Sequence, residues 1–247
     1  MNRTVDVFGV SISKVTMNEA TSKIKEFVKS DTFHSIYTPN PEIIMLAKKD
    51  EKFHQILEEA DLVVPDGIGV VIASRIKKGE KLPERVAGYD LVQNTMKEAV
   101  KEGYKYYFFG SKPGISEEAA VKMRQAYPGI EIVGTRNGYF KPEDEADIIA
   151  DINASGANIL LVALGAPKQE KWIEANKHLM PNVRVAIGVG GSLDVMSGNV
   201  KRAPIAFQKL GLEWFYRLLK EPTRFKRMLV LPEFLIKVIF YKKESRL

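Results

Sequence analysis

The 247-residue chain contains no cysteine, which excludes disulfide bonds, thiolate metal ligands and cysteine nucleophiles. No stretch reaches the ~18 uncharged apolar residues that a membrane-spanning helix requires. The first ten residues hold no apolar run of signal-peptide length, so we expect no secretory leader. The three histidines, His34, His54 and His178, form no i, i+4 pair of metal ligands, and we expect no metal site.

Common nucleotide and hydrolase motifs are missing as well. The chain has no G-x-x-x-x-G-K-[ST] phosphate loop and no G-x-S-x-G nucleophile elbow. The run GVGGSLD at 188–194 has only a superficial likeness to a dinucleotide fingerprint, because Leu193 stands where the third glycine belongs. We interpret Gly190 and Gly191 as making room for a nucleotide or sugar, with Asp194 as a candidate ribose or base ligand.

Charge divides the chain into two parts. Apolar residues make up 45% and charged residues 28% of the chain, values typical of a globular protein. The net charge is +6, but residues 195–247 hold 12 Lys and Arg against 4 Asp and Glu, a net charge of +8. The preceding residues are therefore slightly acidic, and the C-terminal part is strongly basic.

Strand and helix patterns alternate along the acidic part. Apolar runs that predict strands are followed by helical segments of about 10–15 residues, which is typical of a doubly wound, mostly parallel, Rossmann-like α/β sheet. The predicted strands lie at 5–13 (one or two short strands), 33–37, 61–65, 104–109, 130–135, 158–164 and 183–187. A Thr16–Glu19 capping box predicts the start of a helix, and Pro41 suits the first turn of another.

The basic part follows a different pattern. Residues 196–247 predict a helical appendage to a core of residues 1–195, with helices interrupted at Pro222 and Pro232. One apolar helical stripe is predicted from the spacing of four residues, Phe207, Leu210, Trp214 and Leu218. Large apolar side chains among many cations favour an anionic lipid surface as the partner. A solvated basic face and a nucleic-acid-binding tail are the alternatives.

The turns that follow the predicted strands are the candidate site, because such sheets bind ligands outside the carboxyl ends of their strands. Asp66 ends a strand before a Gly-x-Gly turn, where it serves either as a helix cap or as a partly desolvated general base. Thr38 and Asn40 also end a strand, and turn or cap roles are their default interpretation. In the turn GAPKQE, Lys168 and Gln169 are placed to face a polar ligand.

Seven motifs, in order, resemble one family: TPNPE (38–42), PDGIGV (65–70), FFGSKPG (108–114), LGAPKQE (164–170), GVGGSLDVMSG (188–198), KRAP (201–204) and GLEWFYRLLKEPTR (211–224). The chain resembles the WecG/TagA/CpsF glycosyltransferases, glycosyltransferase family 26, over nearly its whole length. Within the family it is most similar to the branch that transfers N-acetylmannosamine in wall teichoic acid synthesis.

The resemblance implies inverting transfer from a UDP-sugar to a polyprenyl-diphosphate-linked GlcNAc, without a metal or other cofactor. Asp66 matches the family's catalytic aspartate, and Thr38 matches a position that orients sugar or acceptor. Arginines of the appendage are implied to fold over the pocket and stabilise the leaving diphosphate. These are Arg217, Arg224 and Arg227. The predicted substrate-binding residues are Asn40, Gly67, Gly110, Ser111, Gly165, Pro167, Lys168, Gln169, Glu170, Gly190, Gly191 and Asp194.

The family also implies a place in the cell. We expect a peripheral protein on the cytoplasmic face of the cell membrane, docked through its appendage, with a self-associating core and no nucleic-acid partner. The predicted donor is UDP-ManNAc, and the resemblance alone supports this choice over UDP-ManNAcA or UDP-Glc. A nucleotide-sugar-binding module without turnover is the competing hypothesis.

Overall fold

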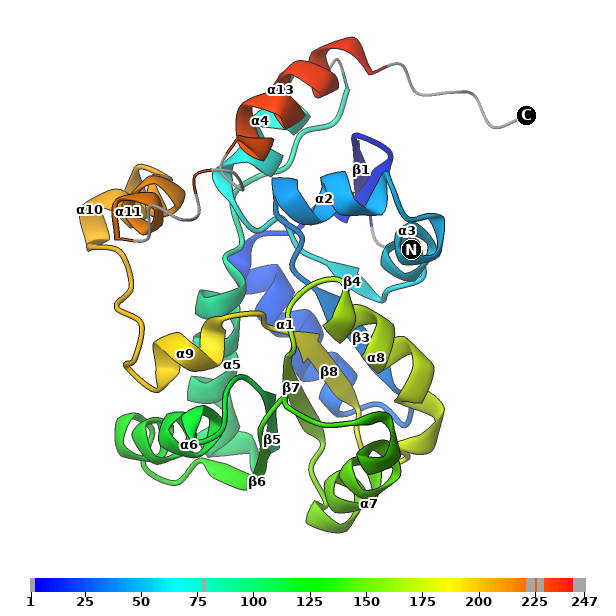
Figure 1. The fold of residues 1–247 in the computed structure, drawn as a ribbon, viewed down its shortest axis with the longest axis vertical. Coiled ribbons are helices and arrows are strands. Elements are labelled where there is room, and N and C mark those ends of the chain that lie inside the picture. Colours follow the sequence, from blue (N-terminus) through cyan, green and yellow to red (C-terminus); the bar gives the residue numbers. More distant parts are fainter. Residues whose placement is uncertain (1–2, 77–78, 221–224, 226–228, 242–247) are drawn as a thin grey trace.

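A computed structural model describes residues 3–76, 79–220, 225 and 229–241. Six parallel strands form the central sheet in the order β4-β3-β8-β7-β5-β6 (Figure 1). They are β3 (His34–Tyr37), β4 (Leu62–Val63), β5 (Lys105–Gly110), β6 (Glu131–Arg136), β7 (Ile159–Ala163) and β8 (Val185–Gly188). A separate antiparallel hairpin consists of β1 (Thr4–Val7) and β2 (Val10–Ser13). The predicted α/β class and parallel sheet are confirmed.

Helices cover both faces of the sheet, and each face has its own apolar core. One core contains side chains of α1 (Met17–Val28), α5 (Gly88–Glu102), α6 (Ile115–Ala126) and α9 (Ser192–Met196). The other contains side chains of α2 (Pro41–Ala47), α3 (Glu51–Glu58), α4 (Ile68–Ile76), α7 (Glu145–Ser155) and α8 (Lys168–Asn176). Short 3-10 turns, η1 (Pro142–Asp144) and η2 (Lys177–Leu179), flank α7 and α8. Burial on both faces explains why β7 is apolar throughout.

Local sequence signals determine where the first helices begin. At α1, the Glu19 backbone N–H donates to Thr16 Oγ1 at 3.3 Å, and the Thr16 N–H donates to Glu19 Oε2 at 2.7 Å. This reciprocal pair is the predicted capping box. At α2, Asn40 Oδ1 accepts from the Ile43 N–H at 3.0 Å and Pro41 is the first helical residue, as predicted.

Strand β4 is shorter than predicted. It spans only Leu62–Val63, whereas the apolar pattern indicated a strand up to Pro65. Proline has no N–H to donate to a strand ladder, so pairing ends before it. Because β4 ends early, the chain turns at Asp66, beside the carboxyl end of β3.

The appendage contains α10 (Ile205–Lys209), α11 (Glu213–Lys220) and α13 (Val230–Phe240). The single apolar stripe predicted from Phe207 to Leu218 is wrong, because the helix is interrupted around Gly211, which has a φ of +70°. The predicted break at Pro232 is also wrong. This proline lies in the first turn of α13, where backbone N–H groups have no acceptor within the helix. Pro222 lies outside the described residues.

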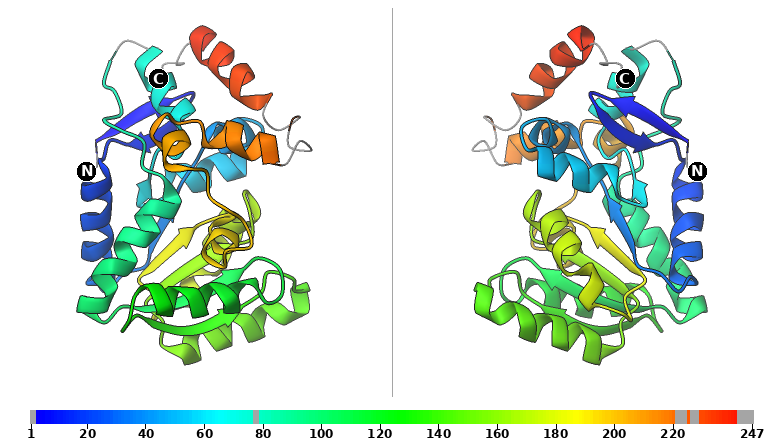
Figure 2. Two further views of the ribbon diagram at one scale, coloured as in Figure 1. Left: turned by 90° about the vertical axis from the view of Figure 1, so that its left-hand side faces the viewer. Right: turned by 90° about the vertical axis from the view of Figure 1, so that its right-hand side faces the viewer.

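Helix α13 packs against the core rather than extending away from it (Figure 2). It contacts α2 and α4, and its Phe234 and Val238 side chains are 0% and 1% exposed. Phe8, at the tip of the β1–β2 hairpin, meets the rings of Phe234 and Tyr241 at centroid distances of 6.0 and 5.2 Å. This end of the appendage therefore shares the apolar core of one sheet face.

We expect Phe234→Ala to release α13 from the core. Truncating a fully buried phenylalanine costs about 3–5 kcal/mol, so a loss of even ~3 kcal/mol increases local opening roughly a hundredfold. Hydrogen–deuterium exchange of the amides at 230–240 measures this opening. The matched control is Phe240→Ala, whose side chain is 78% exposed and whose loss should change exchange little. Equal exchange in the two variants would contradict the packing described here.

Candidate active site

A pocket of about 200 Å³ opens where the carboxyl ends of β3 and β4 meet the appendage. One wall belongs to the core and the other to α11 and the residues around it. The core wall includes Asn40, Asp66, Gly67 and Arg85, and the appendage wall includes Glu213, Trp214 and Arg217. The predicted residues Asp66, Asn40, Gly67 and Arg217 are thus brought together.

Asp66 is the partly buried carboxylate of this pocket. Its backbone N–H donates to the Pro39 carbonyl at 3.2 Å, and its carboxylate accepts from the backbone N–H of Gly88, the first residue of α5. Burial raises the pKa of Asp66, the cations of Arg85 and Arg217 oppose this rise, and Glu213 adds to it. A carboxylate with a raised pKa beside two arginines is suited to accept a proton.

Thr38 and Asn40 support the pocket in different ways. Thr38 Oγ1 donates to the Gly188 carbonyl at 3.4 Å, and a Cβ on Gly88 would lie only 3.0 Å from the Thr38 hydroxyl. Thr38 therefore packs against Gly88, the first residue of α5. Asn40 caps α2, as its default interpretation predicted, and it also lines the pocket. Its role in substrate binding stays a prediction.

A second group of predicted residues lies further along the same edge of the sheet. The connection after β5 leads outward to β6, whereas the connection after β7 leads the opposite way across the sheet to β8. The strand order therefore reverses between the parallel neighbours β5 and β7, which is where such sheets bind ligands. Gly110 ends β5 so close to Ala163 of β7 that an added Cβ would lie 2.4 Å from its backbone. Ser111, with a φ of +58°, donates from Oγ to Asp194 Oδ2 at 3.1 Å.

Gln169 and Glu170 connect the turns after β7 and β8. The buried Gln169 amide donates to Glu170 Oε1 at 2.9 Å and accepts from the Gly190 N–H at 3.0 Å. Burial raises the pKa of Glu170, and its Oε2 has no hydrogen-bond partner among the described residues. The amide nitrogen and oxygen of Gln169 each already make a hydrogen bond within the protein. The direct contact of Gln169 with the donor sugar nucleotide, which the resemblance implied, stays a prediction.

The remaining predicted residues form the rim of this second group. Gly165 and Gly190 have positive φ angles of +76° and +50°, and Gly191 precedes α9. Pro167 precedes α8, and Lys168 is exposed with its Nζ 4.5 Å from the centroid of the Phe140 ring. Thr38 and Gly188 bond across β3 and β8 and join this rim to the Asp66 pocket.

Arg85 lines the pocket although it lies outside all seven motifs. Arg85 Nη2 pairs with Glu213 Oε2 at 2.8 Å, and both side chains are mostly buried. Arg85 lies in the loop before α5, directly after Glu84, and no pattern in that loop distinguishes it from the neighbouring charged residues. Arg224 and Arg227 lie outside the described residues. Across the part of the chain that the structure describes, no three histidine or acidic side chains gather as a metal site requires.

Sequence comparison determines the family. The model of the WecG/TagA/CpsF glycosyl transferase family matches residues 5–247. The chain belongs to this glycosyltransferase family. It is 41% identical over 210 residues to an N-acetylglucosaminyldiphosphoundecaprenol N-acetyl-beta-D-mannosaminyltransferase of Bacillus spizizenii, covering 85% of this chain and 80% of that protein. It is 38% identical over 222 residues to the protein of the same name from Bacillus subtilis, covering 90% and 85%.

We expect Asp66→Asn to stabilise the fold at pH 7. Because burial raises the pKa of Asp66, the folded state binds the proton more tightly than the unfolded chain, so the wild type loses stability as pH rises through the raised pKa. Asparagine cannot ionise, and stabilising changes at functional sites commonly yield about 0.5–2 kcal/mol. Urea denaturation at pH 7 measures the gain.

The gain should shrink as the pH approaches ~4, the ordinary pKa of an aspartate. The exposed Asp31 offers a matched control, because Asp31→Asn should change stability by less than about 0.5 kcal/mol. A lower stability of Asp66→Asn than of the wild type at pH 7 would show that the arginines outweigh burial.

Proposed function

We propose that this glycosyltransferase transfers N-acetylmannosamine from UDP-ManNAc to GlcNAc-diphospho-undecaprenol, with inversion and without a metal. The product would be the linkage-unit disaccharide lipid of wall teichoic acid. The observation that carries the proposal is the Asp66 carboxylate in a pocket with Arg85 and Arg217. The names of two relatives at 41% and 38% identity support the sugar and the acceptor.

Asp66 would act as the general base. The acceptor hydroxyl oxygen forms a bond to C1 of the donor sugar, while the bond from C1 to the diphosphate oxygen breaks and its electron pair leaves with UDP. The hydroxyl proton passes to Asp66, whose raised pKa makes its carboxylate a better proton acceptor than an exposed aspartate. A single displacement of this kind inverts the configuration at C1.

Cations and backbone N–H groups would stabilise the departing diphosphate. Arg217 on α11 and Arg85 on the core line the pocket, and we propose the same role for Arg224 and Arg227. The turn into α8 provides a helix N-terminus at the sheet edge, where the helix dipole favours anions. Preorganised donors of this kind stabilise charge that develops in a transition state.

The turns that follow β5 and β7 would hold the nucleotide part of the donor. Ser111 and Asp194 already share a hydrogen bond there, and the carboxylate of Asp194 is a suitable acceptor for ribose hydroxyls. The glycines of the turns at 165 and 190–191 leave space for a flat or bulky ligand. Thr38, which bonds to Gly188, would sit between the nucleotide and Asp66.

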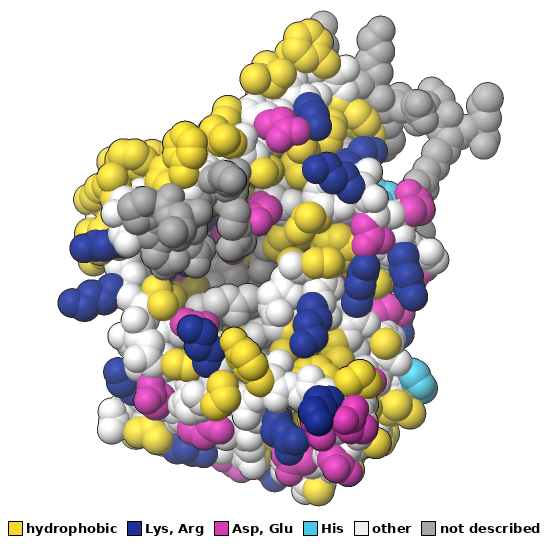
Figure 3. Space-filling model, viewed as in Figure 1, with side chains coloured by type: hydrophobic (Ala, Val, Ile, Leu, Met, Phe, Trp, Pro, Cys, Tyr) yellow, Lys and Arg dark blue, Asp and Glu magenta, His cyan; other side chains and the backbone are white. Residues whose placement is uncertain are grey.

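The lipid-linked acceptor requires a route to the pocket, and we propose that the appendage supplies it at the cytoplasmic face of the membrane. In Figure 3 apolar side chains gather along the appendage, over α10, α11 and α13. They include Ile205, Leu210, Leu219, Leu229, Ile236, Ile239 and Phe240, which are 50–78% exposed. None of the described helices is long and apolar enough to cross a membrane. A peripheral, self-associating enzyme is the form we propose.

We expect the purified protein to release UDP from UDP-ManNAc only when a GlcNAc-diphospho-lipid acceptor is present. A screen of UDP-ManNAc, UDP-GlcNAc, UDP-ManNAcA and UDP-Glc, with mass spectrometry of the lipid product, identifies the sugar transferred. Asp66→Asn should lower kcat by about 10²–10⁴-fold, the usual contribution of a general base, while UDP binding by calorimetry changes little.

Three results would contradict parts of this proposal. Binding of the donor without turnover would favour a nucleotide-sugar-binding module. A product with another sugar would correct the donor, and full turnover by Asp66→Asn would remove Asp66 as the base.

We expect the full-length protein to bind vesicles with anionic lipid and to release them partly at high salt, because cations and apolar groups both contribute. Phe240→Glu places a charge on the exposed apolar face and should weaken vesicle flotation about tenfold. Tyr139→Glu changes a comparably exposed aromatic residue, 69% against 78%, on a different part of the molecule and should have no effect. Retention of DNA but not of vesicles at ~0.15 M salt would instead favour nucleic acid.

A further inference from the structure

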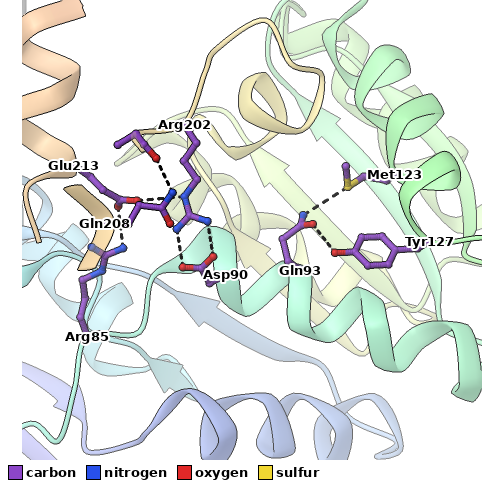
Figure 4. A network of polar contacts seen from close by, with 9 residues as sticks. Arg85, Asp90, Gln93, Met123, Tyr127, Arg202, Gln208 and Glu213 are labelled. Carbon is purple, nitrogen blue, oxygen red and sulfur yellow. Dashed lines mark hydrogen bonds and ion pairs between the residues drawn. The ribbon is translucent and has the colours of Figure 1, made fainter. Parts of the chain in front are cut away.

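Four charged side chains form a continuous network between the core and the appendage (Figure 4). Arg202 Nη1 and Nη2 pair with the two carboxylate oxygens of Asp90 at 2.6 and 2.7 Å, and Arg202 Nε pairs with Glu213 Oε1 at 3.2 Å. The other oxygen of Glu213 accepts from Arg85 at 2.8 Å. All three guanidinium nitrogens of Arg202 are therefore engaged, two of them in a bidentate pair.

The core end of this network lies in the first turn of α5, next to Asp66. Helix α5 begins at Gly88, whose N–H bonds to the Asp66 carboxylate, and continues with Tyr89 and Asp90. The guanidinium carbon of Arg202 lies 4.7 Å from the centroid of the Tyr89 ring, so two successive residues hold the Arg202 side chain between a ring face and a carboxylate. Only 21% of that side chain is exposed, which limits screening by solvent.

The other end of the network lies at the beginning of the appendage. Arg202 stands between α9 and α10, and the next residue, Ala203, is buried and accepts a hydrogen bond from Gln208 Nε2 at 2.6 Å. The segment is thus fixed on both sides of the arginine, since the Val200 N–H donates to the Asp194 carbonyl at 3.0 Å. Through Glu213, Arg202 also contacts the first turn of α11.

We propose that Arg202 is the positioning residue that sets α11 over the Asp66 pocket. Its two terminal nitrogens pair with Asp90 of α5, and its Nε pairs with Glu213 of α11. Arg217, which lines the pocket, follows one helical turn after Glu213. Arg202 touches no reacting atom in this scheme. This inference rests on the proposed function, because a fixed α11 matters only if Arg217 must lie near Asp66 during sugar transfer. A lysine could not replace it, since a single ammonium cannot pair bidentately with Asp90 and reach Glu213.

Trp214 provides a readout that does not depend on activity. The chain has two tryptophans: Trp172, which is buried in the core, and Trp214, which lines the pocket from α11. In a Trp172→Phe background, acrylamide quenching reports the exposure of Trp214 alone. Arg202→Gln should increase the quenching constant at least twofold and lower kcat at least tenfold, while UDP binding by calorimetry stays within threefold.

Matched variants separate positioning from charge and from folding. Arg202→Lys keeps the charge and should stay within threefold of Arg202→Gln in kcat. The exposed neighbour gives the control Lys201→Gln, which should behave as the wild type. Asp90→Asn removes the bidentate pair from the core side and should act in the same direction, and the double variant with Arg202→Gln should be no worse than Arg202→Gln. Circular dichroism shows that each variant folds.

The outcomes are distinct for the two proposals. Unchanged Trp214 quenching and kcat in folded Arg202→Gln, or full recovery in Arg202→Lys, would overturn the positioning role even if the wild type transfers the sugar. If the wild type transfers no sugar but Arg202→Gln exposes Trp214, the proposed function fails, and Arg202 stands only as the anchor of α11.

Discussion

The candidate site depends on keeping one carboxylate partly out of water without leaving it unpaired. Burial raises the pKa of Asp66, while the Gly88 N–H and the cations of Arg85 and Arg217 compensate for the lost solvent. Strand β4 ends early at Val63, and α5 begins with a glycine, Gly88; both features lie beside this carboxylate. Proline stops the ladder just before the carboxylate, and a side chain at Gly88 would press on Thr38.

The edge of the sheet joins that carboxylate to a second region through backbone and side-chain bonds. Thr38 connects β3 to Gly188 at the end of β8, and Gln169 connects the turn after β7 to Gly190. Because these bonds run between adjacent strand ends, they fix the turns after β7 and β8 relative to the end of β3, beside which Asp66 lies. Near-attack geometry requires this kind of rigidity.

Sequence reasoning succeeded where the signal was local. The capping box at Thr16, the proline start of α2, the apolar run of β7 and the glycine-rich turns each lie within a few residues of the structure they determine. Arg85 and the packing of Phe234 were not predictable in this way, because both depend on segments about 130–230 positions apart in the chain. Helix α5 was missed although Leu91, Thr95 and Ala99 recur with helical spacing.

The packing of α13 leaves one face of the helix for the protein core and another for a membrane surface. Phe234 and Val238 face the core, whereas Ile236 and Ile239 are exposed, so the two apolar faces lie on different sides of one helix. A membrane that takes up the exposed face therefore does not compete with the core for the buried one. When the exposed face of α13 binds a membrane, that binding adds to the packing of α13 on the core. It would therefore favour the arrangement in which α11 stays over the Asp66 pocket.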